Sequence, residues 1–139
     1  MKKSNFQLNA EICKIFDLEW YQVWIFDTML YLPTPEEVKK MLGETQTENE
    51  QYRRELYDCD DFSLALLAAQ KLWIVRKGYD FPWAFYRVSG VRSRGMSINH
   101  HWNMVSTQDG IYFCESMSGV DRFWKFESTK KDQIIMAHT

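Results

Sequence analysis

Cys59 is the residue whose type and position most directly suggest chemistry. It lies in YDCDDFSLALLAAQKLW, where a helix-periodic apolar run begins, so its sulfur is expected in the first turn of a helix. Unpaired backbone N–H groups there carry partial positive charge, which favours a thiolate and can hold an oxyanion. Asp58, Asp60 and Asp61 suit a helix start equally well, and free cysteine is commonly a small core residue. The stretch therefore leaves a nucleophilic and a structural cysteine both open.

A nucleophilic thiol needs a base, and the adjacent histidines of INHHWNMV are the candidates. On a strand His100 and His101 point to opposite faces, so only one can face a given cleft. If STQD forms a four-residue hairpin loop, Val105 pairs with Gly110 and His100 lies opposite Glu115. That register predicts a His100–Glu115 pair that fixes the ring tautomer. A five-residue loop would instead place His101 opposite Glu115. The other alternative is that His100 only lies at the edge of a sheet and Glu115 only ends a strand, without a functional role.

Helices in the first part of the chain must position the cysteine. The apolar spacing from residue 12 to residue 20 suits a helix, while YQVWIF is ambiguous between helix and strand. A capping box with Thr34 as N-cap and Glu37 three residues on predicts a second, short helix that Gly43 should end. The run that follows Cys59 predicts the central helix, with Gly78 just past its end.

Strands in the last part of the chain must position the histidines and the glutamate. PWAFYRVSG, INHHWNMV, GIYFCES and VDRFWKF are rich in aromatic and branched residues, and VRSRGMS, STQDG and MSG separate them. This pattern predicts four strands joined by a loop and short turns. Helices first and an antiparallel sheet afterwards indicate an α+β fold, with the central helix packed on the sheet.

The totals fit one packed domain. The 139 residues are 45% apolar and 16% aromatic, and we expect a single unit with a helical part at about 1–78 and a sheet part at about 79–139. With 17 basic and 19 acidic residues, the charge gives no reason to expect nucleic acid or an anionic membrane as partner. Three cysteines form no closed disulfide set, and no long apolar run is present, so a cytoplasmic protein is expected.

Three motifs together resemble those of a known family. YDCDDFSLAL is similar to the Cys-Asp-Asp-Phe-Ala start of the catalytic helix in transglutaminase-like cysteine proteases, a branch of the papain-like superfamily. HHWNMV is similar to their His-x-Trp-Asn strand, and GIYFCESMSG to the strand and turn that follow. The likeness covers about residues 52–119, and it extends to the C-terminal protease domain of the fairy-ring mushroom agglutinin and to small bacterial and phage domains.

The resemblance implies a papain-like or transglutaminase-like thiol enzyme that cleaves or transfers at an amide or isopeptide bond. Cys59 would be the nucleophile, His100 the base and Glu115 the acidic third member of a catalytic triad, with His101 as the alternative base. The substrate would be a protein or a peptide. Whether the acyl group passes to water or to an amine, hydrolase or transferase, stays open.

Metal binding is a secondary expectation. The agglutinin's protease depends on calcium, so the resemblance makes Asp58, Asp60 and Asp61 candidate calcium ligands, although one helix start should not direct all three carboxylates to one ion. A site built from Cys59, Cys114 and a histidine lacks paired-ligand spacing. No other cofactor is expected.

The alternative function belongs to a different class. The same fold could serve as a non-catalytic binding or inhibitory module, for example a phage-encoded protein that targets a host protein in the host cytoplasm. The chain has six Trp, seven Tyr and nine Phe, and any of these rings left exposed would form a recognition surface.

Overall fold

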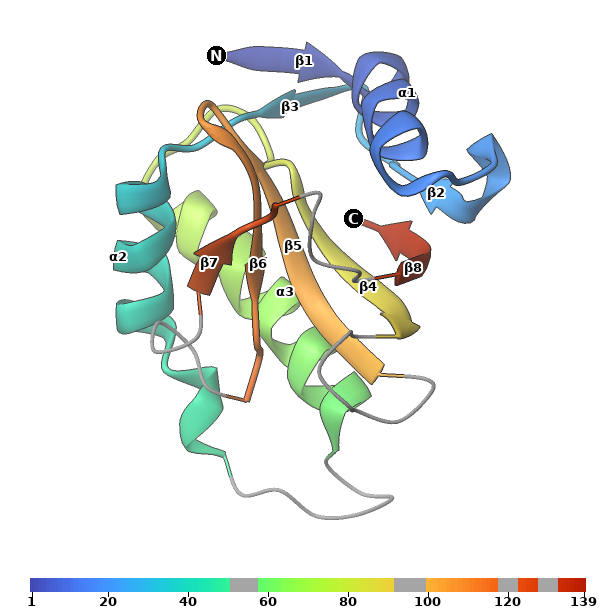
Figure 1. Cartoon of the computed structure of the whole chain (residues 1–139). Helices are drawn as coiled ribbons and strands as arrows, with labels where there is room; N and C mark the ends of the chain where they lie inside the picture. The colour runs from blue at the N-terminus through green and yellow to red at the C-terminus, as the bar shows by residue number, and fades with distance from the viewer. Residues whose placement is uncertain (51–57, 92–99, 118–122, 128–132) are drawn as a thin grey trace.

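The fold is a twisted six-stranded sheet with helices on both of its faces (Figure 1). The computed structural model describes residues 1–50, 58–91, 100–117, 123–127 and 133–139. Within these residues the helices are α1 (Asn5–Phe16), α2 (Pro35–Thr45) and α3 (Cys59–Arg76), with short 3₁₀ turns at Trp20–Gln22 and Thr47–Asn49. The strands are β1 (Lys2–Ser4), β2 (Val23–Trp24), β3 (Met29–Tyr31), β4 (Phe85–Val91), β5 (His100–Thr107), β6 (Gly110–Cys114), β7 (Phe123–Lys125) and β8 (Gln133–His138).

The sheet runs in the order β2-β8-β4-β5-β6-β7, and β1 pairs with β3 in a separate two-stranded ribbon. Every pairing in the large sheet is antiparallel except that of β2 with β8. The expected α+β class, with the central helix packed on an antiparallel sheet, is therefore confirmed. The part predicted to be helical also holds three short strands, and the pairing strand β8 was not predicted.

Two apolar cores lie on the two faces of the sheet. Side chains of α1 pack with one set of strand residues, and side chains of α2 and α3 pack with the alternate set. In β5 this alternation puts Trp102 and Met104 in the core on the α1 side and Val105 in the core on the α3 side. His100 therefore belongs to the α1 face of the sheet, and His101 belongs to the α3 face.

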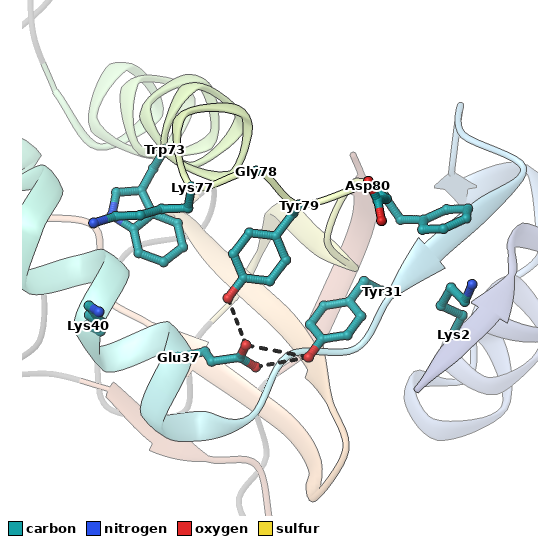
Figure 2. Close-up of a pocket in the computed structure, with 10 residues that line it drawn as sticks. Lys2, Tyr31, Glu37, Lys40, Trp73, Lys77, Gly78, Tyr79 and Asp80 are labelled. Carbon is teal, nitrogen blue, oxygen red and sulfur yellow. Dashed lines mark hydrogen bonds between the residues drawn. The ribbon is translucent and has the colours of Figure 1, made fainter.

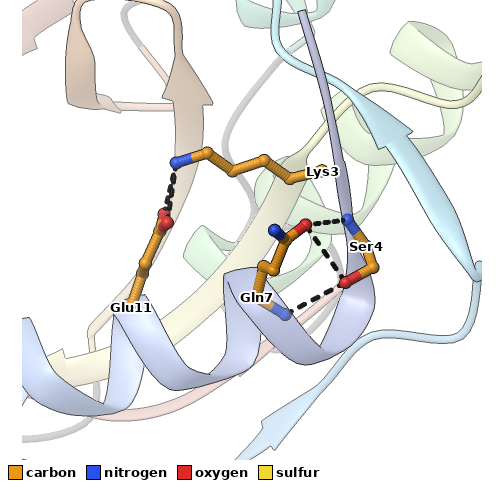
Figure 3. A network of polar contacts seen from close by, with 4 residues as sticks. All are labelled: Lys3, Ser4, Gln7 and Glu11. Carbon is orange, nitrogen blue, oxygen red and sulfur yellow. Dashed lines mark hydrogen bonds and ion pairs between the residues drawn. The ribbon is translucent and has the colours of Figure 1, made fainter.

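Helix α1 begins at a complete capping box (Figure 3). The Ser4 hydroxyl accepts from the Gln7 N–H at 3.3 Å, the Gln7 amide oxygen accepts from the Ser4 N–H at 2.9 Å, and Lys3 reaches Glu11 at 2.7 Å. The helix ends at Phe16 because Asp17 takes a left-handed conformation, with φ of 54°. The predicted continuation to residue 20 is thus wrong.

The capping-box prediction for α2 is confirmed, but its predicted end is not. Thr34 is the N-cap and exchanges hydrogen bonds with Glu37, at 3.2 Å and 2.7 Å. The helix continues through Gly43 to Thr45, and left-handed Gln46 provides the C-cap. Gly43 has ordinary helical geometry, so this glycine does not end the helix.

Helix α3 begins at Cys59, as predicted, with Asp58 as N-cap and Asp61 completing a capping box. It ends at Arg76, and Gly78 follows in the left-handed region at φ of +78°. The predicted VRSRGMS loop falls mostly on residues 92–99, and most of the MSG turn falls on 118–122, outside the described residues.

The β5–β6 hairpin is tighter than predicted. Thr107 pairs with Gly110 across a two-residue turn, so Val105 lies opposite Tyr112 rather than Gly110. The Thr107 hydroxyl donates to the Gly110 carbonyl and accepts from the Asp109 N–H, which stabilises this turn. The error is two residues, an even number, so every side chain keeps its predicted face.

Candidate functional site

The predicted histidine–glutamate pair is present, although the register that led to it was wrong. His100 Nε2 lies 2.9 Å from one carboxylate oxygen of Glu115 and 3.1 Å from the other. Both side chains are buried, and the His100 ring stacks on Trp102 with centroids 5.6 Å apart. In the observed register the two residues are diagonal rather than direct neighbours, a separation that long side chains still bridge. The pair lies on the α1 face of the sheet.

Cys59 lies on the other face of the sheet, against His101. The backbone N–H of His101 donates to the Cys59 sulfur, and the His101 ring contacts the Ser89 hydroxyl at 2.9 Å through Nδ1. The structure thus brings Cys59 together with the alternative base and separates it from His100 and Glu115. The Cys59–His100–Glu115 triad, as predicted, is not assembled.

The electrostatics around Cys59 oppose a thiolate. Burial raises the pKa of the Cys59 thiol, and the Asp58 and Asp60 carboxylates raise it further. The hydrogen bonds from the N–H groups of His101 and of Cys59 itself lower the pKa but do not reverse this direction. Burial also lowers the pKa of His101, and the nearby Arg87 guanidinium adds to that shift. Of the two interpretations that the sequence left open, these directions favour a structural cysteine.

Polar side chains join α3 to the sheet beside Cys59. Asn103 donates to the carbonyls of Ser63 and Tyr86, at 3.0 Å and 3.3 Å, and its amide oxygen accepts from the Ser116 hydroxyl. The Arg87 side chain donates to the Ser63 hydroxyl at 3.0 Å. These bonds satisfy buried polar atoms and fix the helix on the sheet, which is a structural role.

Alkylation of Cys59 should therefore be slow at neutral pH and should accelerate only above the ordinary thiol range, since the thiolate is the reacting form. The rate with iodoacetamide can be followed peptide by peptide by mass spectrometry, with Cys13 as the internal comparison. We also expect the His101→Ala protein to retain a slow rate. Fast labelling below pH 7 that disappears in His101→Ala would contradict this assignment.

The three aspartates at the start of α3 are close together, contrary to expectation. Asp58, Asp60 and Asp61 each offer a carboxylate oxygen, and these atoms lie within 4.8 Å of one another. Asp61 also accepts from the Asp58 N–H in the capping box. Calcium binding at this acidic cluster stays a prediction.

A second candidate site was not located from the sequence: an aromatic patch formed by the start of α1 and the segment between α1 and β3. Its rings are Phe6, Trp20, Tyr21, Trp24 and Phe26, and all of them are exposed, Trp20 at 73% and Phe26 at 70%. Two adjoining hollows of about 380 and 340 Å³ lie among these rings and share Asn9 and Trp20 in their walls. Clustered exposed rings of this kind mark binding surfaces.

Hydrogen bonds hold the aromatic patch in shape. Asn9 of α1 donates to the carbonyls of Trp20 and Val23, at 3.2 Å and 2.9 Å. The Trp24 indole donates to the Tyr21 carbonyl at 2.6 Å, and the Thr139 N–H donates to the Trp24 carbonyl at 3.0 Å. The rings are thus presented on a fixed backbone, which reduces the entropy lost on binding. The signal in the sequence was the density of rings in WYQVWIF, but helical spacing placed Trp20 with the buried residues.

A larger hollow, of about 690 Å³, opens between α2, the end of α3 and β1 (Figure 2). Glu37 is one of its lining residues, and the Tyr79 hydroxyl donates to it at 2.7 Å and the Tyr31 hydroxyl at 3.3 Å. Burial is the largest influence on Glu37 and acts to raise its pKa, but the hydrogen bonds outweigh it and the pKa is lowered. Lysines line the rim, yet Lys77 pairs with Glu44 at 3.0 Å. Positive and negative groups here nearly balance, so charge selects no ligand class.

Comparison with known proteins shows a likeness in fold. No family model matches the sequence, and no curated protein is similar to it. Several solved structures are similar, and two of them each have a TM-score of 0.76 and 16% identity over 99% of this chain. One is described as "PSL1a-E64 complex", the other as Polyporus squamosus lectin bound to a human-type influenza-binding epitope, Neu5Aca2-6Galb1-4GlcNAc. This chain spans 51% and 49% of those chains, about half their length.

These comparisons contradict the predicted family and activity. The similar structures are those of a lectin, and neither description names a protease or a transglutaminase. The assignment to transglutaminase-like or papain-like cysteine proteases is therefore wrong, as are the predicted thiol enzyme and its hydrolase or acyl-transferase activity. The separation of Cys59 from His100 and Glu115 agrees with this correction. At 16% identity the likeness itself establishes only the fold.

Among the described residues, no helix combines the length and the apolar character needed to cross a membrane.

Proposed function

We propose that this chain is a non-catalytic binding module whose aromatic patch binds carbohydrate. The observation that carries the proposal is the set of five exposed rings around two adjoining hollows, with the Asn9 amide in the wall of both. The apolar C–H face of a sugar ring packs on an aromatic ring, which exposed rings around a hollow allow. The lectin structures of similar fold add support.

The lining of the patch favours neutral sugar rings. The two hollows are lined by Asn, Phe, Trp, Tyr, Val and Ile, and no charged side chain is among these lining residues. A carboxylate such as that of a sialic acid would find no cation there to compensate its lost hydration. We therefore expect the patch to contact uncharged sugars, and not the acidic sugar named for the similar lectin.

The test is a glycan panel that contains matched sialylated and desialylated members, followed by calorimetric titration of the best ligand. We expect binding that does not require sialic acid and that changes little with salt, because the patch is uncharged. Trp20→Ala should weaken binding by at least about tenfold, as for a central aromatic contact. The matched control is Leu72→Ala, which removes an exposed apolar side chain of α3.

Two results would overturn the proposal. One is a panel in which no glycan binds the wild-type protein. The other is binding that Trp20→Ala leaves unchanged, or that depends on sialic acid and on low salt, because either would place the sugar away from the aromatic patch.

A further inference from the structure

The central helix is apolar on its outer side as well as on its inner side. Its inner side packs on the sheet, with Phe62, Leu66 and Ile74 buried. On its outer side Leu72 is 57% exposed and Val75 is 73% exposed. A helix that is apolar all round is normally covered all round, so this outer surface is unusual for a helix in contact only with water.

The exposed apolar residues form one stripe. Leu64, Ala68, Leu72 and Val75 follow one another at intervals of four, four and three residues, which places them on a single face over three turns. All four are exposed, so no described part of the chain covers them. We call these four residues the outer stripe. Along the outer stripe the side chains are in turn large, small, large and of medium size.

The outer stripe is complementary to itself. If a second α3 lies antiparallel across it on a two-fold axis near residue 70, Leu64 of each copy meets Val75 of the other, and small Ala68 receives Leu72. A hollow of about 300 Å³ borders Val75, and in this arrangement it would receive Leu64 of the second copy. Two large side chains would thus each enter a recess, which is how helices pack closely.

The charges at the two ends of the helix support the same arrangement. Asp61 lies in the first turn of α3 and Arg76 lies in the last turn, while Asp60 of the first turn pairs with Arg87 of the sheet at 3.8 Å. In an antiparallel pair the acidic end of one helix adjoins the basic end of the other, and the helix dipoles also oppose favourably. A parallel pair would instead bring like charges together.

We propose that the outer stripe of α3 is an interface with a second copy of this chain, in a symmetric dimer with the two α3 helices antiparallel. One pair of helices buries less than the roughly 800 Å² per partner of a standard stable interface. The dimer should accordingly be weak, with a Kd on the order of micromolar or above. The inference is independent of the proposed sugar binding, which uses a different surface.

Sedimentation velocity over a series of protein concentrations tests the dimer. The wild-type protein should shift from monomer to dimer as concentration rises, and Leu72→Arg should raise the Kd by at least about tenfold, because it puts two charges at the centre of the interface. Ile15→Arg, on the exposed side of α1, is the matched control and should leave the Kd unchanged. Melting curves for each variant establish that it is folded.

A charge exchange tests the orientation. Arg76→Asp alone should weaken the dimer, and adding Asp61→Arg in the same chain should restore it. A wild-type protein that stays monomeric at every concentration would overturn the inference. A dimer that persists in Leu72→Arg, or that Ile15→Arg abolishes, would overturn it too. The glycan titration is a separate measurement, so a negative result for the dimer would not bear on the proposed sugar binding at the aromatic patch.

Discussion

Replacing Trp102 with alanine is expected to lower the free energy of unfolding by about 3–5 kcal/mol, the usual range for removing a large buried ring. Trp102 is fully buried in the core between α1 and the sheet, with the His100 ring stacked on one side and the Phe113 ring edge-on at 5.8 Å. Domains of this size are stable by about 5–15 kcal/mol in total. The loss would therefore be a large share of the whole, measurable by urea unfolding.

The matched control is Trp24→Ala, which removes the same side chain from the aromatic patch. Trp24 is 54% exposed, so we expect a change within about 0.5 kcal/mol. This comparison also establishes that a patch variant is folded before its sugar binding is judged. Equal losses from the two substitutions would contradict the placement of Trp102 in the core.

Features set by neighbouring residues could be predicted from the sequence. The capping box at Thr34 depends on side chains three positions apart, and it formed where expected, as did the start of α3 at Cys59. The end of α1 shows the limit of the same approach. Residues up to Trp20 continue the apolar spacing, but Asp17 turns the chain, and no glycine or proline announced this.

The candidate site shows why distant geometry is harder to predict. Period-two alternation correctly gave His100 and His101 opposite faces, and this was a local inference. Which face meets Cys59 depends on the side of the sheet to which α3 packs, and that is set by the whole pairing order. The alternation of the two histidines was therefore predicted correctly, while the face of the sheet that meets Cys59 was not.

Which aromatic residues are exposed could not be predicted from the sequence either. Rings are ordinarily expected in a core, and WYQVWIF has enough of them to read as one. Only the structure shows that Val23 and Ile25 turn toward the interior while Trp20 and Trp24 point to solvent, because β2 is a two-residue edge strand and has one covered side. Residues on the uncovered side then became the candidate binding surface.

The buried His100–Glu115 pair should have a large effect on stability when it is broken, and a small one when it is replaced as a whole. Glu115→Ala leaves the His100 ring without the carboxylate it contacts at 2.9 Å and opens a cavity, so we expect a loss of about 3–5 kcal/mol in the free energy of unfolding. His100→Phe combined with Glu115→Leu removes both polar groups and keeps most of the volume. The double variant should be more stable than Glu115→Ala, because the cost of desolvating the pair disappears along with its attraction.

Urea unfolding of both single variants, His100→Phe and Glu115→Leu, together with the double variant gives the coupling energy of the pair directly. We expect the losses of unfolding free energy in the two single variants to add up to more than the loss in the double variant. Each single change leaves one polar side chain of the pair buried among Trp102 and its neighbours. If both single changes are neutral, the pair is reached by water in solution and the packing described for this face of the sheet is incorrect. A strong coupling would assign the two residues a structural role on the α1 face, remote from the thiol with which their sequence motifs first associated them.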